Sequence, residues 1–287
     1  MARFTTSDGI GIAYRTWADD AAGPPVVLHH GFIANAQLNW VLPGVVDALV
    51  AAGRRVVAHD ARGHGRSDTP HDRALYGEAR MARDVAELAD HLGLDAFDLV
   101  GYSMGGVTAT IVAAQEPRVR RLVIGGIGSA IVELGGVDTR VMDRDALADV
   151  LEQDDPGVVA DPTVAAFRGF VDAVGGDRLA LAAQARSVHR TPIALDRITA
   201  PTLLLVGAED PLASRPEVLA AAIADCRVAV VAGDHMGALA DPGFTPALVS
   251  HLAGGEVPRV CDALSRKGLC ICEGGVAGLS HGATGPG

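Results

Sequence analysis

The chain has 287 residues, of which 49% are hydrophobic and only 4% aromatic, so a buried core must be built mostly from aliphatic side chains. Its formal net charge of −11 argues against nucleic-acid binding and against docking on anionic membranes, since both require clustered basic residues. Every one of the 24 basic residues except Lys267 is an arginine. Mechanisms that depend on a lysine, such as Schiff-base chemistry or a P-loop, are therefore excluded from residues 1–266.

Targeting and membrane signals are weak. Met1–Asp8 contains no apolar stretch of the kind found in secretory signals. The uncharged stretch Leu99–Gln115 is too short for a membrane span and is interrupted by Gly, Ser and Thr. Four cysteines do not make a disulfide framework in a chain of this length. We therefore expect a reduced, cytoplasmic protein with no membrane partner.

Short apolar runs alternate with segments of helical periodicity, which predicts an α/β fold with a mostly parallel central sheet flanked by helices. Helices are expected at Val45–Ala52 and Glu78–Leu92, each followed by a glycine that can adopt left-handed backbone, and from Met104 to Gln115. The expected strands are Pro25–His29, Arg55–Asp60, Phe97–Tyr102, Arg121–Gly125, Thr202–Gly207 and Arg227–Val231.

Residues 129–196 break this alternation, because they contain helical patterns and no convincing strand. The patterns cover Asp143–Gln153, Thr163–Val174 and Asp177–Ser187. A helical insertion between two strands predicts a lid over the carboxyl edge of the sheet, where open α/β sheets bind their ligands. The alternative is that these helices only thicken the domain. Residues 1–128 and 197–253 would form the core.

The composition changes after the last expected helix. Residues 254–287 are rich in glycine, contain Cys261, Cys270 and Cys272, and show no apolar periodicity. This pattern predicts a disordered tail. Cys270 and Cys272 are too closely spaced and too isolated for a zinc site, so no metal is expected there.

Ser103 occupies the centre of a G-x-S-x-G pattern, directly after the expected strand Phe97–Tyr102 and before the helix that starts at Met104. In that context the pattern predicts a nucleophile elbow, a tight turn that exposes the serine hydroxyl at a strand end and a helix N-terminus. A serine needs a base to take its proton and an acid to orient the base. For this elbow the chain order is serine, acid, histidine.

Two later loops supply the partners in that order. Asp210 follows the strand Thr202–Gly207, and His235 follows the strand Arg227–Val231, so both should lie at the same sheet edge as Ser103. Glu209 and Asp234 are rival acids, but Asp210 is preferred, since Asp234 is adjacent to the base itself.

An oxyanion hole needs two backbone N–H groups aimed at the developing negative charge. Met104, the residue after the serine, should supply one, helped by the helix dipole. The loop after the strand Pro25–His29 should supply the other from Phe32, with Gly31 allowing the turn.

Together these motifs resemble the α/β-hydrolase superfamily, and they are most similar to small bacterial esterases, enol-lactonases and cofactor-free haloperoxidases. The resemblance covers roughly residues 5–252 and implies a helical lid and a Ser103–His235–Asp210 triad. A serine at position 103 disfavours the branches with an aspartate nucleophile. The motifs are His30-Gly31-Phe32, residues 60–67, Gly101–Gly106, Gly207–Asp210 and Gly233–His235.

The sequence thus predicts a serine hydrolase that cleaves a small carboxylic ester or lactone through an acyl-enzyme. No cofactor is expected, and Gly126-Ile127-Gly128 lacks the third glycine of a dinucleotide fingerprint. A perhydrolase that uses peroxide, a C–C bond hydrolase and a non-catalytic small-molecule sensor remain alternatives, and the oligomeric state stays open. The residues expected to line the substrate pocket, unless they pack in the core, are Trp40, Tyr102, Phe167, Phe170 and Met236.

Overall fold

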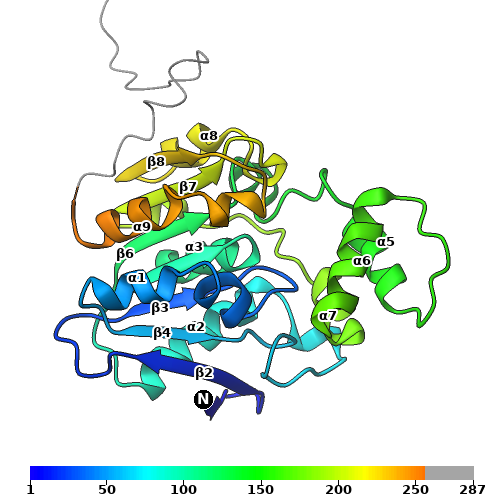
Figure 1. Ribbon diagram of the computed structural model, residues 1–287, viewed down its shortest axis with the longest axis horizontal. Coiled ribbons are helices and arrows are strands. Elements are labelled where there is room, and N and C mark those ends of the chain that lie inside the picture. Colours follow the sequence, from blue (N-terminus) through cyan, green and yellow to red (C-terminus); the bar gives the residue numbers. More distant parts are fainter. Residues whose placement is uncertain (256–287) are drawn as a thin grey trace, which may run out of the picture.

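A computed structural model describes residues 1–255 of the chain (Figure 1). In this part of the chain eight strands form one sheet in the order β1-β2-β4-β3-β5-β6-β7-β8. The strand β2 pairs antiparallel with both of its neighbours, β1 and β4, and all other neighbouring strands pair in parallel, so the predicted mostly parallel sheet is confirmed. The strands are β1 (Ala2–Thr5), β2 (Gly11–Trp17), β3 (Val26–His29), β4 (Val56–His59), β5 (Phe97–Tyr102), β6 (Val119–Gly125), β7 (Thr202–Gly207) and β8 (Cys226–Val231).

The six expected strands are present, and β1 and β2 were not predicted. These two form an antiparallel hairpin at one edge of the sheet. In the structure β1 is mostly exposed and the second half of β2 is only half-buried. Their sequences therefore lack the continuous apolar run that marks a strand buried on both faces, and this is why they were not predicted.

Helices cover both faces of the sheet and enclose two apolar cores. On one face α1 and α9 pack over Val26, Leu28 and Val100, and on the other α2, α3 and α8 pack over Val27 and Leu99. Successive strand residues point to opposite faces, so each inner strand contributes to both cores. These helices are α1 (Val45–Ala51), α2 (Glu78–His91), α3 (Met104–Gln115), α8 (Pro216–Ala221) and α9 (Phe244–Leu252).

A group of helices between β6 and β7 forms the insertion expected at 129–196. Figure 1 shows α5, α6 and α7 beside the sheet, on the side toward which the parallel strands point. They share an apolar cluster that includes Leu147, Val171 and Leu181. Aspartate side chains cap the N-termini of all three. The helices are α4 (Ala130–Leu134), α5 (Arg144–Leu151), α6 (Pro162–Val174) and α7 (Arg178–Ala185).

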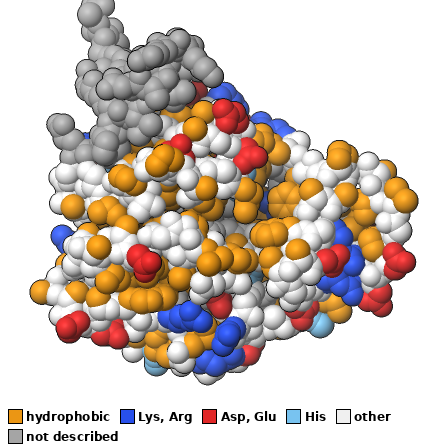
Figure 2. All heavy atoms as spheres, viewed as in Figure 1, with side chains coloured by type: hydrophobic (Ala, Val, Ile, Leu, Met, Phe, Trp, Pro, Cys, Tyr) orange, Lys and Arg blue, Asp and Glu red, His pale blue; other side chains and the backbone are white. Residues whose placement is uncertain are grey.

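The surface of the insertion is divided by chemistry. In Figure 2 hydrophobic side chains border the junction of the insertion with the sheet domain, and basic and acidic ones gather along its lower part. In the insertion Arg186 forms ion pairs with Asp149 and Glu152. Within the described residues no helix has the length and apolarity of a bilayer span. The predicted tail lies outside the described residues from position 256 onward, together with its cysteines.

Candidate active site

Ser103 lies at the carboxyl end of β5 and directly precedes α3. Its backbone has φ 55° and ψ −118°, a conformation that residues other than glycine rarely adopt. The Ser103 N–H donates to the Gly125 carbonyl oxygen at 2.9 Å, which helps to hold the turn. A strained serine between a strand and a helix is the conformation expected of a nucleophile elbow.

The two glycines of G-x-S-x-G are required by close backbone approach. A Cβ on Gly101 would lie 2.0 Å from the Gly105 carbonyl oxygen, and a Cβ on Gly105 would lie 2.2 Å from the His29 carbonyl oxygen. Both distances are far inside van der Waals contact, so no larger residue fits without moving the backbone.

His235 and Asp210 are brought together from the loops after β8 and β7. The His235 Nδ1 atom lies 2.8 Å from Asp210 Oδ2, and the second Asp210 oxygen accepts the N–H of Leu212 at 2.9 Å. The Asp210 side chain is fully buried, and that of His235 is 17% exposed. Because the ionised carboxylate can only accept, Nδ1 carries the proton and Nε2 is left as the basic nitrogen.

The rival acids have other partners. Glu209 accepts the N–H of Gly233 at 3.0 Å, and Asp234 accepts those of Met236 and Gly237 at 3.1 and 2.8 Å. Both carboxylates therefore shape the turn that carries His235, whereas Asp210 holds its ring.

Tyr102 contacts the back of His235, a role that the sequence did not indicate. Its hydroxyl donates to the His235 carbonyl oxygen at 2.6 Å, and the two rings lie 5.3 Å apart. Gly126 packs against the same pair, since a Cβ there would lie 3.0 Å from His235 Cε1. Tyr102 was expected to line the substrate pocket; in the structure its side chain is buried and contacts His235.

No hydrogen bond joins the Ser103 hydroxyl to His235 in this structure. Such bonds are often long in resting enzymes and shorten only when substrate binds. The elbow and the His235–Asp210 pair nevertheless lie together, because Tyr102 immediately precedes Ser103 and its ring contacts His235.

The loop after β3 is held in a fixed conformation. His30 accepts the Ala61 N–H on Nε2 at 2.8 Å and donates from Nδ1 to the Gly31 carbonyl oxygen at 2.7 Å. The Gly31 N–H donates to Asn39 Oδ1 at 2.9 Å. Neither the Phe32 N–H nor the Met104 N–H has an acceptor among the described residues. Both proposed oxyanion donors are therefore free to bind a ligand.

The remaining predicted pocket residues lie in three different environments. Trp40 is 0% exposed and packs between α1 and the sheet, so it is a core residue rather than a substrate contact. The short turn Gln37–Val41 directs it inward. Phe167 and Phe170 are half-buried and pack in the apolar cluster of the insertion. Met236, next to His235, is 57% exposed.

Four further histidines surround the oxyanion loop in the core. His29 packs edge to face on His59, with ring centroids 4.7 Å apart, and His30 packs similarly on His64 at 5.1 Å. Burial lowers the pKa of both His29 and His64 to about 4, so they remain neutral at physiological pH. Among the described residues no group of three or more His, Cys, Asp or Glu could hold a metal ion.

A cleft of about 490 Å³ opens beside the site. Ile33 and His64 line it on the sheet side, and Gly175–Asp177 of the insertion line the other side. Ser103 and His235 are not among its lining residues, so this cleft does not contain the catalytic positions.

Comparisons with known proteins agree with this geometry. The family model of the α/β-hydrolase fold matches residues 24–158. A non-heme chloroperoxidase of Streptomyces lividans is 42% identical over 129 residues, which are 43% of this chain and 44% of that protein. The aligned part of the chain thus spans less than half the length of that relative.

Solved structures align over nearly the whole described chain. A hydrolase from Pseudomonas aeruginosa is 28% identical with a TM-score of 0.66, over 88% of this chain and 97% of that one. An esterase from Exiguobacterium antarcticum is 26% identical with a TM-score of 0.70, over 88% and 99%. The chain therefore has the α/β-hydrolase fold and is similar to small bacterial hydrolases and esterases over most of its length.

Proposed function

We propose that the protein is a serine hydrolase that cleaves a small carboxylic ester or lactone through an acyl-enzyme. The observation that carries the proposal is the hydrogen bond between His235 and the buried Asp210, next to a serine in strained backbone. Two backbone N–H groups without acceptors, those of Phe32 and Met104, flank that serine. Nucleophile, base, orienting acid and oxyanion donors are all assigned.

The reaction would proceed in two steps. His235 Nε2 takes the Ser103 proton as Oγ attacks the carbonyl carbon, and the N–H groups of Phe32 and Met104 stabilise the oxyanion. The bond to the leaving oxygen breaks, and His235 returns the proton to it. Water then attacks the acyl-enzyme while His235 takes its proton, and Ser103 leaves with that proton as the acid is released.

The test is hydrolysis of a chain-length panel of activated esters and lactones by the wild-type protein and by Ser103→Ala. The substitution should lower kcat by about 10⁶-fold, as removal of a serine nucleophile does elsewhere. A fluorophosphonate should label the wild-type protein at Ser103 and leave the variant unlabelled. Undiminished hydrolysis by Ser103→Ala would refute the scheme.

A perhydrolase is the second candidate, and the similarity to a non-heme chloroperoxidase favours it. The same acyl-enzyme would be attacked by hydrogen peroxide instead of water and would release a peracid. Comparing acetate- and peroxide-dependent halogenation with ester hydrolysis separates the two activities, since both require Ser103 but only one requires peroxide.

We further propose that residues 129–196 act as a lid over this site. The apolar cluster of α5, α6 and α7 is supported by Phe32 and Ile33 of the oxyanion loop. The insertion therefore packs directly on a loop that should bind the substrate carbonyl, which is the contact a lid requires.

A further inference from the structure

Arg144, the first residue of α5, is a buried cation without a partner. It is 5% exposed, and its Nε atom is fully enclosed and has no hydrogen-bond acceptor. Among residues 1–255 its guanidinium forms neither a hydrogen bond nor an ion pair within 4.0 Å. Burying a charge in this way is costly unless something pairs with it.

Arg144 does not stabilise the helix α5 in which it lies. A cation in the first turn opposes the helix dipole, and α5 already has its cap from Asp143. Arg168 of α6 is a useful contrast, because it is buried to a similar extent in the same insertion. It donates to Asp172 and to the carbonyl oxygens of Val150, Gln153 and Asp154.

The guanidinium of Arg144 lies over the ring of Phe32, with Cζ 5.2 Å from the ring centroid. Phe32 provides one of the two proposed oxyanion donors, and its ring also packs in the apolar cluster that includes Met104, the residue of the other. The guanidinium of Arg144 thus stacks on the side chain of a residue whose backbone N–H is a proposed oxyanion donor.

Glu78 is the nearby acid, but it forms no hydrogen bond or ion pair with Arg144. Glu78 is buried at the N-terminus of α2 and attracts the guanidinium electrostatically, but its oxygens accept the His189 N–H at 2.6 Å and the Gln184 side-chain amide at 3.3 Å. Burial lowers the pKa of Arg144 to about 10, which still leaves it charged at neutral pH.

We propose that Arg144 binds a carboxylate on the substrate, so that the preferred substrates are esters or lactones that also bear a free carboxylate group. This inference rests on the proposed function, because the carboxylate would be held in the pocket of Ser103. A planar guanidinium is suited to the task, since it can present two parallel N–H groups to one carboxylate. Phe32 would fix the plane of the guanidinium from one side.

The test compares two substrates that differ only in charge. The mono-4-nitrophenyl ester of adipic acid carries a free carboxylate, and its methyl-capped diester does not. We expect wild-type kcat/KM to favour the carboxylate ester. Arg144→Met should lower that ratio by about 10- to 100-fold, the range of a charge-assisted hydrogen bond in a buried site. Arg144→Lys should retain part of the preference.

Arg168→Met is the matched control, because it removes a buried arginine of the same insertion whose donors are already engaged. It should lower stability and leave the ratio unchanged. Arg144→Gln replaces Arg144→Met if the latter does not fold. A wild-type enzyme that shows no preference, or a preference that Arg144→Met retains, would overturn the inference while leaving the hydrolase intact.

A binding measurement separates this inference from the proposed function. Monomethyl adipate, which carries the carboxylate but is not an activated ester, should raise the Tm of the wild-type protein and not that of Arg144→Met. If neither ester is hydrolysed but this shift is seen, the carboxylate-binding site at Arg144 stands and the hydrolase proposal fails. If the wild-type protein shows no shift, the carboxylate site is refuted.

Discussion

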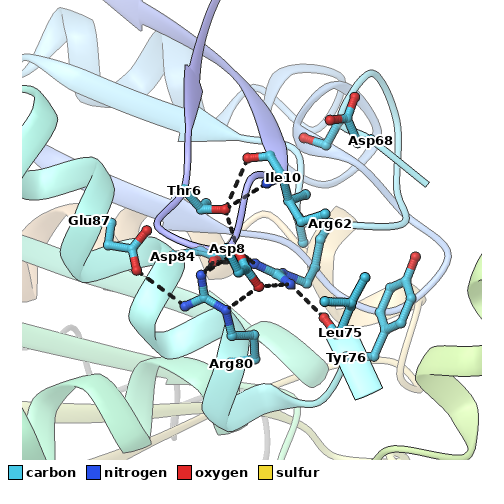
Figure 3. A network of polar contacts seen from close by, with 12 residues as sticks. Thr6, Asp8, Ile10, Arg62, Asp68, Leu75, Tyr76, Arg80, Asp84 and Glu87 are labelled. Atoms are coloured by element: carbon cyan, nitrogen blue, oxygen red, sulfur yellow. Dashed lines mark hydrogen bonds and ion pairs between the residues drawn. The ribbon is translucent and has the colours of Figure 1, made fainter. Parts of the chain in front are cut away.

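Two buried arginines, Arg62 and Arg144, show opposite uses of the same side chain. Arg62 is 0% exposed and lies in the loop after β4 (Figure 3). It donates to both oxygens of Asp84 at 2.7 Å each, to both oxygens of Asp8 at 3.0 and 3.1 Å, and to the Leu75 carbonyl oxygen at 2.6 Å. Arg144 is almost as deeply buried and has none of these bonds.

The contacts of Arg62 extend into a network that ties the N-terminal hairpin to α2. Arg80 donates to both oxygens of Asp8 at 2.8 and 2.7 Å and forms an ion pair with Glu87 at 3.3 Å. Thr6 donates to Asp8 at 2.5 Å. We call Thr6, Asp8, Arg62, Arg80, Asp84 and Glu87 the hairpin network (Figure 3).

The comparison teaches that burial of a charge does not by itself indicate a function. In the hairpin network every charge has a protein partner, so the network fixes the fold. Arg144 has no such contact within the described residues, where only Glu78 attracts it without a hydrogen bond, and we propose that a ligand carboxylate completes its pairing. Substitutions in the two regions should therefore change different quantities. Those in the catalytic site should change turnover, and those in the hairpin network should change the free energy of unfolding.

After the loss predicted for Ser103→Ala, the largest effect is expected at the acid of the site. Asp210→Asn should lower kcat by about 10⁴-fold, because the amide no longer favours the tautomer in which Nε2 is basic. Glu209→Gln is the matched control, since Glu209 is adjacent and bonds only to the backbone of Gly233. Steady-state kinetics on an activated ester would measure both. Equal losses in the two variants would contradict the assignment of Asp210.

The next effect falls on the hairpin network. Arg62→Met leaves Asp84 and Asp8 without their central partner and should reduce the free energy of unfolding by about 3–5 kcal/mol. Arg144→Met removes no hydrogen bond or ion pair among the described residues, only the Phe32 stacking and the attraction to Glu78, and should reduce stability by less than Arg62→Met does. Urea unfolding of both variants checks the contrast. A larger loss from Arg144→Met would mean that Arg144 is structural.

A smaller effect on turnover is expected from Tyr102. Tyr102→Phe removes the hydrogen bond to the His235 carbonyl oxygen and should lower kcat by about fivefold with little change in KM, in line with one hydrogen bond of about 1 kcal/mol. Tyr14→Phe is the control, because Tyr14 bonds to His91 at 3.1 Å, far along the chain from the triad loops. An unchanged kcat in Tyr102→Phe would remove Tyr102 from the positioning of His235.

Sequence patterns located the elements with strong local signals. The inner parallel strands are continuous apolar runs, and the elbow at Ser103 is marked by glycines that no other residue can replace. The loops of Asp210 and His235 followed from strand order alone. Because parallel strands end at one edge, the sheet itself brings those loops together.

What the sequence did not reveal depends on contacts between distant segments. The hydrogen bond of Tyr102 reaches a residue 133 positions away, and no local pattern encodes it. Trp40 was expected in the pocket but packs in the core, since its direction is set by a short turn of unusual backbone. The sequence does not distinguish Arg62 from Arg144. Only tertiary packing decides which of the two arginines has hydrogen-bonding partners.

The smallest expected effect is the dependence of stability on pH through Asp8. The hydrogen bond from Arg80, with those from Arg62 and Thr6, holds the pKa of Asp8 far below its usual value. In the unfolded chain this carboxyl has a pKa of about 3.9. The folded state therefore binds fewer protons near pH 4, so the contribution of Asp8 to the free energy of unfolding is complete above about pH 5 and is lost as the pH falls.

Urea unfolding at pH 5, 4 and 3 should show a steeper loss of stability for the wild-type protein than for Asp8→Asn. Asp20→Asn, which changes an exposed aspartate of the same end of the chain, should keep the wild-type slope. If Asp8→Asn also kept it, the hairpin network would hold the fold by geometry alone, and its charges would matter no more than a neutral set of hydrogen bonds.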